Sequence, residues 1–421
     1  MRFEWESAPR SRAPELNATW ARLEIRILES VVTRVEDRRC SSTRTGIYVP
    51  LFPIAEWLVS NWFFLWDEWR EDAPRERHNL LSAREGFALP DLSFRPTESK
   101  VHLAWRRSEA PFSRLEFLAE GTAALTKAVV REECCRLVEA VIQRLRDAPG
   151  EQTTGGFHLD QDWQALKDVL RDREQRQFCE RAARLGLDGF DVSEELAEQI
   201  EALSSLLPDT VLDDFCNAVA PGEILSGAGF VRDFLKSSDR EAGEDRWEEV
   251  RGQMARVSSG SPWRDGYEQA ARLRSCLGLE GRVPSDLAEY LRSSLGHADV
   301  VSITAPSRIE GISRRKKGYV PKFGIPSVLR PDSQRFVLAR AVGDFLALGE
   351  TALITKGHTE HQRRNRAFAA EFLAPADSIR KHIHGETIEE DDLAELAAEF
   401  QVSDYVIRHQ IENHGLARIA A

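Results

Sequence analysis

Residue types that bind metal ions gather in one stretch of this 421-residue chain. They are His358, Glu360, His361, His382 and His384. Imidazole nitrogens and carboxylate oxygens are ligands that zinc prefers, so the first three could form a metal site. The surrounding residues, Gly357 to Gln362, instead predict a polar loop, because no helix there would hold the ligands in a fixed geometry. A metal site made of His358, Glu360 and His361 therefore remains an alternative.

A run of basic residues indicates a second possible binding site. The run is Arg314-Arg315-Lys316-Lys317, with Arg308 and Lys322 nearby. Such side chains can hold phosphates, but a solvated hairpin tip explains the run as well. The chain has 57 Lys+Arg against 69 Asp+Glu and a formal net charge of -12, which argues against broad attraction to nucleic acid or anionic lipid. Nucleic-acid contact is therefore possible but not favoured.

Common nucleotide and hydrolase motifs are missing from the sequence. It contains no G-x-x-x-x-G-K-[ST] loop and no G-x-S-x-G elbow. The six cysteines never form a C-x-x-C pair, which predicts reduced thiols. The aromatic segment from Ile47 to Trp69 contains too many prolines and charges to span a membrane, and the start lacks a secretory pattern. We expect a cytoplasmic protein without membrane contact.

Hydrophobic patterning predicts an α+β fold that opens with a domain over residues 1–148. Alternation from Leu23 to Ile27 predicts a strand, and alternation from Leu92 to Trp105 predicts a hairpin. Tryptophans recur after Pro53 and predict a buried helix. Residues 131–146 have the pattern of an amphipathic helix. This domain therefore combines sheet and helix.

The middle of the chain is predicted to be helical. Composition indicates a linker from Ala148 to Gly156, followed by a helical segment over residues 160–236. The Ser-, Gly- and charge-rich stretch from Lys236 to Pro262 predicts a flexible connection. Residues 262–298 then form a helical lead-in to the terminal domain.

Residues 299–421 are predicted to form a terminal α+β domain. Val300 to Thr304 has the pattern of a strand, and Ile309 to Phe323 that of a hairpin around Lys317-Gly318. The helices expected after them span residues 334–348, 363–373, 391–400 and 404–414.

Three segments of this terminal domain resemble the ImmA/IrrE-type zinc peptidases. Arg335 to Asp344 reads R-F-V-L-A-R-A-V-G-D and is similar to the family's active-site helix, R-F-x-L-A-H-E-x-G-H. Gln362 to Pro375 resembles the block that supplies the third zinc ligand, and Leu393 to Leu416 resembles the closing helix-turn-helix-like pair. The resemblance covers roughly residues 299–416 and implies a zincin-like domain.

The chemistry of that family site is replaced in this sequence. The resemblance places Arg340 and Asp344 at the two histidine positions, Ala341 at the general base and Gln362 at the third ligand. A zincin helix needs histidines at i and i+4 and a glutamate beside the first. Four replacements in a matching frame predict a site that neither binds zinc nor hydrolyses peptides. Helical spacing also predicts a salt bridge between Arg340 and Asp344, with a hydrogen bond from Gln362.

The resemblance implies a regulatory pseudopeptidase, since active relatives cleave repressors that control stress or mobile-element genes. We expect a bacterial-type protein that binds a protein partner or peptide in the vacated cleft and needs no cofactor. One alternative is an active zinc metallo-endopeptidase with non-standard ligands that cleaves a repressor-type protein. Another is a DNA-binding regulator that uses Arg408, His409 and Arg418 of the closing pair. Against it, a stripe of apolar residues predicts packing of that pair: Leu393, Leu396, Ala397 and Phe400.

Overall fold

The computed structural model describes residues 1–8, 13–70, 72–110, 113–148, 154–241, 243, 246–254, 261–306, 308–347 and 351–420. The chain forms two compact units, Met1–Val192 and Ser193–Ala421. Each unit contains both helices and strands, so the predicted α+β class is confirmed. Within the described ranges, every helix is too short or too polar to cross a membrane.

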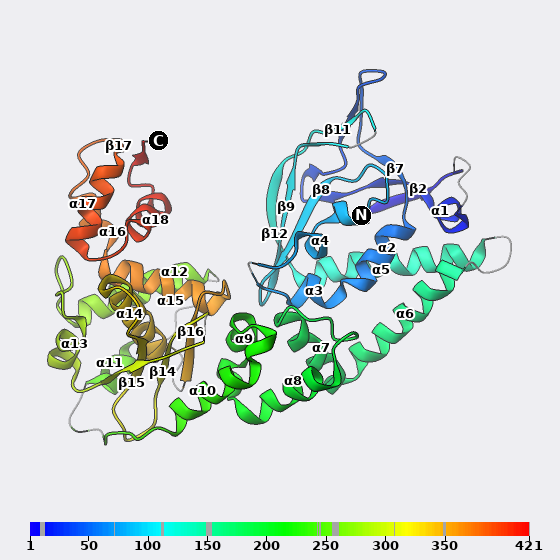
Figure 1. Ribbon diagram of the computed structural model, residues 1–421. Helices are drawn as coiled ribbons and strands as arrows, with labels where there is room; N and C mark the ends of the chain where they lie inside the picture. The colour runs from blue at the N-terminus through cyan, green and yellow to red at the C-terminus, as the bar shows by residue number, and fades with distance from the viewer. Residues whose placement is uncertain are drawn as a thin grey trace. The chain divides into compact units, whose positions relative to one another are not determined.

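The first unit consists of small antiparallel sheets and of helices, two of which are rich in aromatic residues (Figure 1). The strand orders are β1-β2-β7, β12-β9-β8 and β10-β11-β5-β6, with β3-β4 as a separate hairpin. The strands are β1 (Arg2–Trp5), β2 (Trp20–Glu24), β3 (Arg26–Ile27), β4 (Ser30–Val31), β5 (Val35–Asp37), β6 (Ser42–Arg44), β7 (Ile47–Pro50), β8 (Asp91–Pro96), β9 (Lys100–Arg106), β10 (Ser108–Glu109), β11 (Leu115–Phe117) and β12 (Gly121–Thr126). The helices are α1 (Pro14–Ala18), α2 (Phe52–Ser60), α3 (Trp62–Asp67), α4 (Arg75–His78), α5 (Lys127–Asp147), α6 (Thr154–Arg171) and α7 (Arg173–Arg184), with a 3-10 turn η1 (Leu80–Ala83).

Several sequence predictions for this unit are confirmed. The alternating residues near Leu23 form β2 and β3, and the predicted hairpin is β8 paired with β9, in which Phe94 faces Leu103. The aromatic helix is present as α2 and α3, which meet at Asn61, and Trp66 of α3 is fully buried. Burial of these rings supplies much of the apolar core.

Helix α6 begins inside the predicted linker from Ala148 to Gly156, and the first unit continues past residue 148, where the sequence predicts a domain end, to Val192. Residues 149–153 lie outside the described ranges, but Thr154 already begins α6. Helix α6 packs against α2 and α5, and its Trp163 lies 5.4 Å from Trp62, measured between ring centroids. This aromatic packing keeps α6 in the first unit, although its first residues have the composition of a linker.

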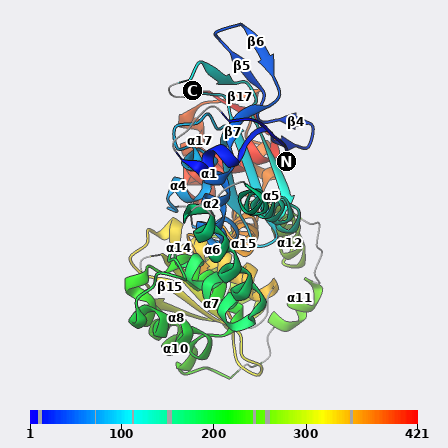
Figure 2. The ribbon, with the colours of Figure 1, turned by 90° about the vertical axis from the view of Figure 1, so that its right-hand side faces the viewer.

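A four-stranded mixed sheet is the centre of the second unit, in the order β13-β15-β14-β16. Helix α14 packs across β14, β15 and β16, and α12 and α15 run side by side in both views (Figure 1; Figure 2). The strands are β13 (Asp299–Ile303), β14 (Ile309–Arg314), β15 (Lys322–Pro326), β16 (Thr351–Thr355), β17 (Thr387–Ile388) and β18 (Arg418–Ile419). The helices are α8 (Glu194–Leu206), α9 (Asp209–Ala218), α10 (Ile224–Lys236), α11 (Trp247–Gln253), α12 (Pro262–Cys276), α13 (Leu287–Leu295), α14 (Pro331–Ala347), α15 (Glu360–Leu373), α16 (Ala376–Arg380), α17 (Glu390–Phe400) and α18 (Asp404–His414), with a 3-10 turn η2 (Pro221–Glu223).

The predicted strand, hairpin and helices of residues 299–414 are confirmed, but several further elements were not predicted, among them β16, α16, β17 and β18. The hairpin is β14 paired with β15, with Ile312 opposite Gly324. Strand β16 was not predicted, and the stretch from Lys236 to Pro262, expected to be a flexible connection, contains α11 in its described part. Trp247 of α11 is only 1% exposed because its ring packs against Phe323 and Phe345. One buried tryptophan thus orders a segment whose composition is polar.

Candidate functional site

The two helices that carry the family-like motifs, α14 and α15, pack closely against each other at Gly343. A side-chain carbon added at Gly343 of α14 would lie 2.5 Å from the ring of Phe368 on α15. Glycine is therefore required at this position for the two helices to approach. Their contact brings Arg340, Asp344 and Gln362 together, and all three are buried. Ala341, the fourth replaced position, packs in the hydrophobic core instead.

Every nitrogen of the Arg340 guanidinium is engaged. Its Nε donates to Oδ1 of Asn365 at 2.9 Å, and Nη1 donates to Oε2 of Glu310 at 2.5 Å. Its Nη2 donates to the carbonyl of Thr355 at 2.9 Å and to Oε1 of Gln362 at 2.7 Å. A guanidinium suits this role, because its planar fork offers donors in fixed directions and stays charged when buried. Gln362 takes part in this network, as predicted, and it does so by accepting a hydrogen bond from Arg340.

The predicted salt bridge between Arg340 and Asp344 is wrong. Asn365 links the two residues: it accepts from Arg340 and donates through Nδ2 to Oδ2 of Asp344 at 3.0 Å. The carboxylate that pairs with Arg340 is Glu310, on β14. Helical spacing placed both side chains on one face, but Asn365 from the neighbouring helix occupies the space between them. Asn365 lies three residues after Gln362, so both project from the same face of α15.

Asp344 is paired with a histidine rather than with the arginine. Nε2 of His361 lies 2.7 Å from Oδ1 of Asp344, and Nδ1 of the same ring hydrogen-bonds Asp214 of α9. Oγ1 of Thr359 donates to Asp214 at 2.8 Å and also caps the first turn of α15. The ring therefore connects α9 to both motif helices.

The electrostatics of this cluster hold His361 in its charged form. Burial alone would lower the pKa of His361, but the carboxylates of Asp344 and Asp214 outweigh burial and raise that pKa to about 10. Burial would raise the pKa of Asp214, yet the imidazolium beside it keeps that pKa below its usual value. At neutral pH the cluster is an imidazolium between two carboxylates, in which both ring nitrogens are donors.

These residues do not fit a zinc ion. A zinc ligand must offer a lone pair, and the protonated guanidinium of Arg340 has none to offer. Both ring nitrogens of His361 are already hydrogen-bonded to carboxylates. In the described ranges, no three His, Cys, Asp or Glu side chains are arranged to hold a metal. His358, of the alternative metal set, lines a groove instead, and the predicted polar loop becomes helix from Glu360 onward. His382 pairs with Glu399 at 3.2 Å, away from this cluster.

A groove of about 1050 Å³ opens beside the cluster in the second unit. Arg340 and Glu310 contribute to its lining, as do residues of α12, α14, α15, α18 and the ends of β13 and β15. Its lining includes large apolar side chains: Trp263, Tyr267, Val328, Phe336, Tyr405 and Val406. Val328 is 90% exposed and Tyr405 is 66% exposed, so apolar surface is open to a ligand. Grooves that combine apolar walls with a few polar groups commonly bind ligands.

Most of the basic run on the β14–β15 hairpin is paired within the protein. Arg314 is buried and bonds Asp239 and the carbonyls that end α10. Arg315 makes a two-pronged pair with Glu248 at 2.6 and 2.8 Å, and Lys316 lies 3.4 Å from Asp239. Lys317, at the hairpin tip, is exposed. These pairs leave little positive charge for a phosphate.

The closing helices pack as the apolar stripe predicts. Leu393, Leu396, Ala397 and Phe400 are all buried in the core of the second unit. Arg408 of α18 pairs with Glu390, and His409 lies with its ring edge against Tyr405. Arg418 lies on β18, beyond the helical pair.

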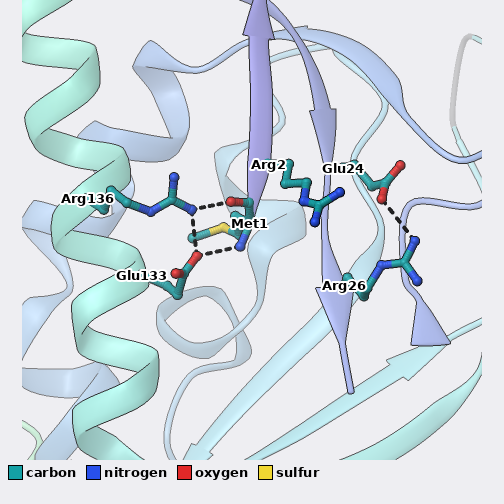
Figure 3. Close-up of a pocket in the computed structure, with 6 residues that line it drawn as sticks. All are labelled: Met1, Arg2, Glu24, Arg26, Glu133 and Arg136. Atoms are coloured by element: carbon teal, nitrogen blue, oxygen red, sulfur yellow. Dashed lines mark hydrogen bonds and ion pairs between the residues drawn. The ribbon is translucent and has the colours of Figure 1, made fainter. Parts of the chain in front are cut away.

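A smaller hollow of about 380 Å³ lies in the first unit (Figure 3). The terminal ammonium of Met1 pairs there with Glu133, and Arg136 donates to the carbonyl of Met1. Arg26 pairs with Glu24 at 3.2 Å. The contacts of Met1 fix the start of the first strand to α5, and the charged groups of this hollow are used in these ion pairs.

Comparison with protein families, with curated proteins and with solved structures finds no match to this chain. The resemblance to ImmA/IrrE-type peptidases therefore rests on the three sequence segments described above.

Proposed function

We propose that this chain is a cytoplasmic, catalytically inactive relative of the ImmA/IrrE-type peptidases that binds a peptide segment of a partner protein. A regulatory role, in stress or phage defence, follows from the same resemblance. The observation that carries the proposal is the open apolar groove lined in part by Arg340, at a position where the family has a zinc ligand. A binding groove can outlast hydrolysis, since affinity and catalysis use different contacts.

The free edge of the sheet supports a peptide as ligand. Strand β13 lies at the end of the sheet order and pairs with β15 on one side, among the strands that the structure describes. Its last residue, Ile303, lines the groove, together with the segment that follows it to Pro306. An extended peptide can add to such an edge through backbone hydrogen bonds while its side chains enter pockets. This arrangement favours a peptide over a compact small molecule.

Ion pairs within the basic run, and the pair of Arg408 with Glu390 on the closing helices, argue against the DNA-binding alternative. Arg314, Arg315 and Lys316 are neutralised by Asp239 and Glu248. The zinc-endopeptidase alternative would require Arg340 and His361 to leave their buried partners, and separating such partners typically costs several kcal/mol. Both alternatives therefore have weaker physical support than peptide binding.

Selection from a displayed library of random peptides on the immobilised full chain tests the proposal. We expect enriched peptides to bind the Tyr405→Ala variant about tenfold more weakly, because Tyr405 forms part of the apolar wall. The matched control is Leu225→Ala, since Leu225 of α10 is also exposed but lies outside the groove. No enrichment, or equal loss in both variants, would contradict binding in this groove.

A further inference from the structure

The charge of the groove is opposite in sign to that of the whole chain. Among the described residues, four cationic side chains line it: Lys356, Arg340, Arg363 and Arg366. The lining carboxylates are Glu310 and Asp332. The chain itself carries a formal net charge of -12. A local excess of positive charge in an acidic protein attracts anionic ligands to that place.

Both carboxylates of the lining already have cationic partners. Glu310 pairs with Arg340 at 2.5 Å, and Asp332 pairs with Arg330 at 3.4 Å. These partners use the acidic groups that could otherwise neutralise the rest of the lining. The remaining cations therefore determine the charge that a ligand meets.

Two cations of the groove have no such compensation. In the part of the chain that the structure describes, the side chains of Lys356 and Arg363 form no ion pair with any carboxylate. Lys356 follows β16, and Arg363 lies in the first turn of α15. By contrast, Arg315 and Arg408, elsewhere in the same unit, each have a carboxylate within 2.6 Å. Lys356 and Arg363 thus place two unpaired cations in the same groove as the exposed apolar side chains.

We infer that the groove selects peptides that combine apolar side chains with an aspartate or glutamate, whose carboxylate pairs with Lys356 and Arg363. The inference rests on the proposed peptide-binding function and names the chemical class of its ligand. Arg363 can grip a carboxylate with two parallel hydrogen bonds, and Lys356 adds a second charge. The wall formed by Tyr405 and Val406 receives the apolar side chains. A nucleic-acid duplex would pair with the cations through its phosphates but leave this apolar wall without a partner, because its bases are already stacked on one another.

The test uses the strongest peptide enriched on the full chain and a copy in which each Asp and Glu is replaced by Asn or Gln. We expect the neutral copy to bind about tenfold more weakly, and the difference to shrink at high salt, because the ion pairs are screened. The double variant Lys356→Gln/Arg363→Gln should bind the acidic peptide about tenfold more weakly and the neutral copy unchanged. Lys317→Gln, at the exposed hairpin tip, is the matched control and should change neither.

Equal affinity for the acidic and neutral peptides would overturn acid selection while leaving the peptide-binding groove intact. Failure of the library to enrich any peptide would instead overturn the proposed function. A 20-nucleotide single-stranded DNA is used as a competitor. The inference would also be overturned if this DNA displaced the peptide and bound the Tyr405→Ala variant as tightly as the natural chain. That result would show a polyanion site that does not depend on the apolar wall.

Discussion

His361 provides the sharpest test of how the buried cluster stabilises the second unit. Replacement by glutamine removes the imidazolium and leaves Asp214 and Asp344 buried without their shared counter-charge. The pKa of His361 is raised from 6.5 to about 10. At pH 7 the protonated ring of the folded protein therefore lies about three pH units below its pKa. At about 1.4 kcal/mol per unit, His361→Gln should lower the free energy of unfolding by ~4 kcal/mol. Breaking a buried ion pair by removing one partner typically costs about 3–5 kcal/mol, which agrees.

The sign of the pH dependence follows from the raised pKa. A histidine whose pKa is higher in the folded state contributes its full stabilisation below pH 6.5 and loses it as the pH rises through 10. The difference between the natural chain and His361→Gln should therefore shrink from ~4 kcal/mol at pH 7 to ~1.4 kcal/mol at pH 9.

Hydrogen exchange in denaturant, read for residues of β16 and α15, is the appropriate assay because a chain with two compact units need not unfold in one transition. The control is His382→Gln: His382 is exposed and its pair with Glu399 should contribute under about 1 kcal/mol. Equal stability of the two variants at pH 7, or a difference that grows with pH, would refute this reasoning.

The remaining predictions concern packing, the arginine fork and the thiols. Gly343→Ala should destabilise the second unit by about 1–3 kcal/mol, because the added methyl group would clash with Phe368. Gly222→Ala is the control and should cost under about 1 kcal/mol, because the space around Gly222 is open. Equal destabilisation of the two variants, measured by hydrogen exchange in denaturant, would contradict the close approach of the two helices. Arg340→Lys should lower the free energy of unfolding of the second unit by about 2–4 kcal/mol in the same assay. An ammonium group cannot donate to all four acceptors in the directions that the guanidinium reaches. An unchanged stability would show that these directed hydrogen bonds are dispensable. All six cysteines should react with a thiol reagent after denaturation, and fewer than six reactive thiols would contradict this prediction. In the native protein, exposed Cys40 should react first, whereas Cys134 should react slowly because burial raises its pKa to about 12. Fast reaction at Cys134 would contradict this order.

Much of the terminal domain could be predicted because its signals are local. Alternation specified β13, the Lys317-Gly318 turn specified the β14–β15 hairpin, and helical periodicity specified α14 and α15. The motif frame also predicted correctly that Arg340 and Gln362 come together.

The partners of the replaced residues could not be predicted in the same way. Asp214 lies on a helix far upstream, and its approach to His361 depends on how α9 packs against β16. Glu310 meets Arg340 because helix α14 packs against strand β14, a tertiary contact that no local pattern encodes. Asn365 did carry a signal, since it follows Gln362 by three residues on a helix. The predicted salt bridge failed because helical spacing fixes a shared face but says nothing of competitors from a neighbouring helix.

The central claim is that the groove binds a peptide and does not cleave it. For the direct measurement, the full chain is incubated with one equivalent of zinc and an enriched peptide. The mass of the peptide and the hydrogen exchange of the protein are then followed in the same samples. We predict an intact peptide, with protection that appears at residues 299–306, 326–337 and 403–413, which include the groove lining. Peptide fragments that accumulate with time, together with about one bound zinc per chain, would contradict the claim and favour an active metallopeptidase.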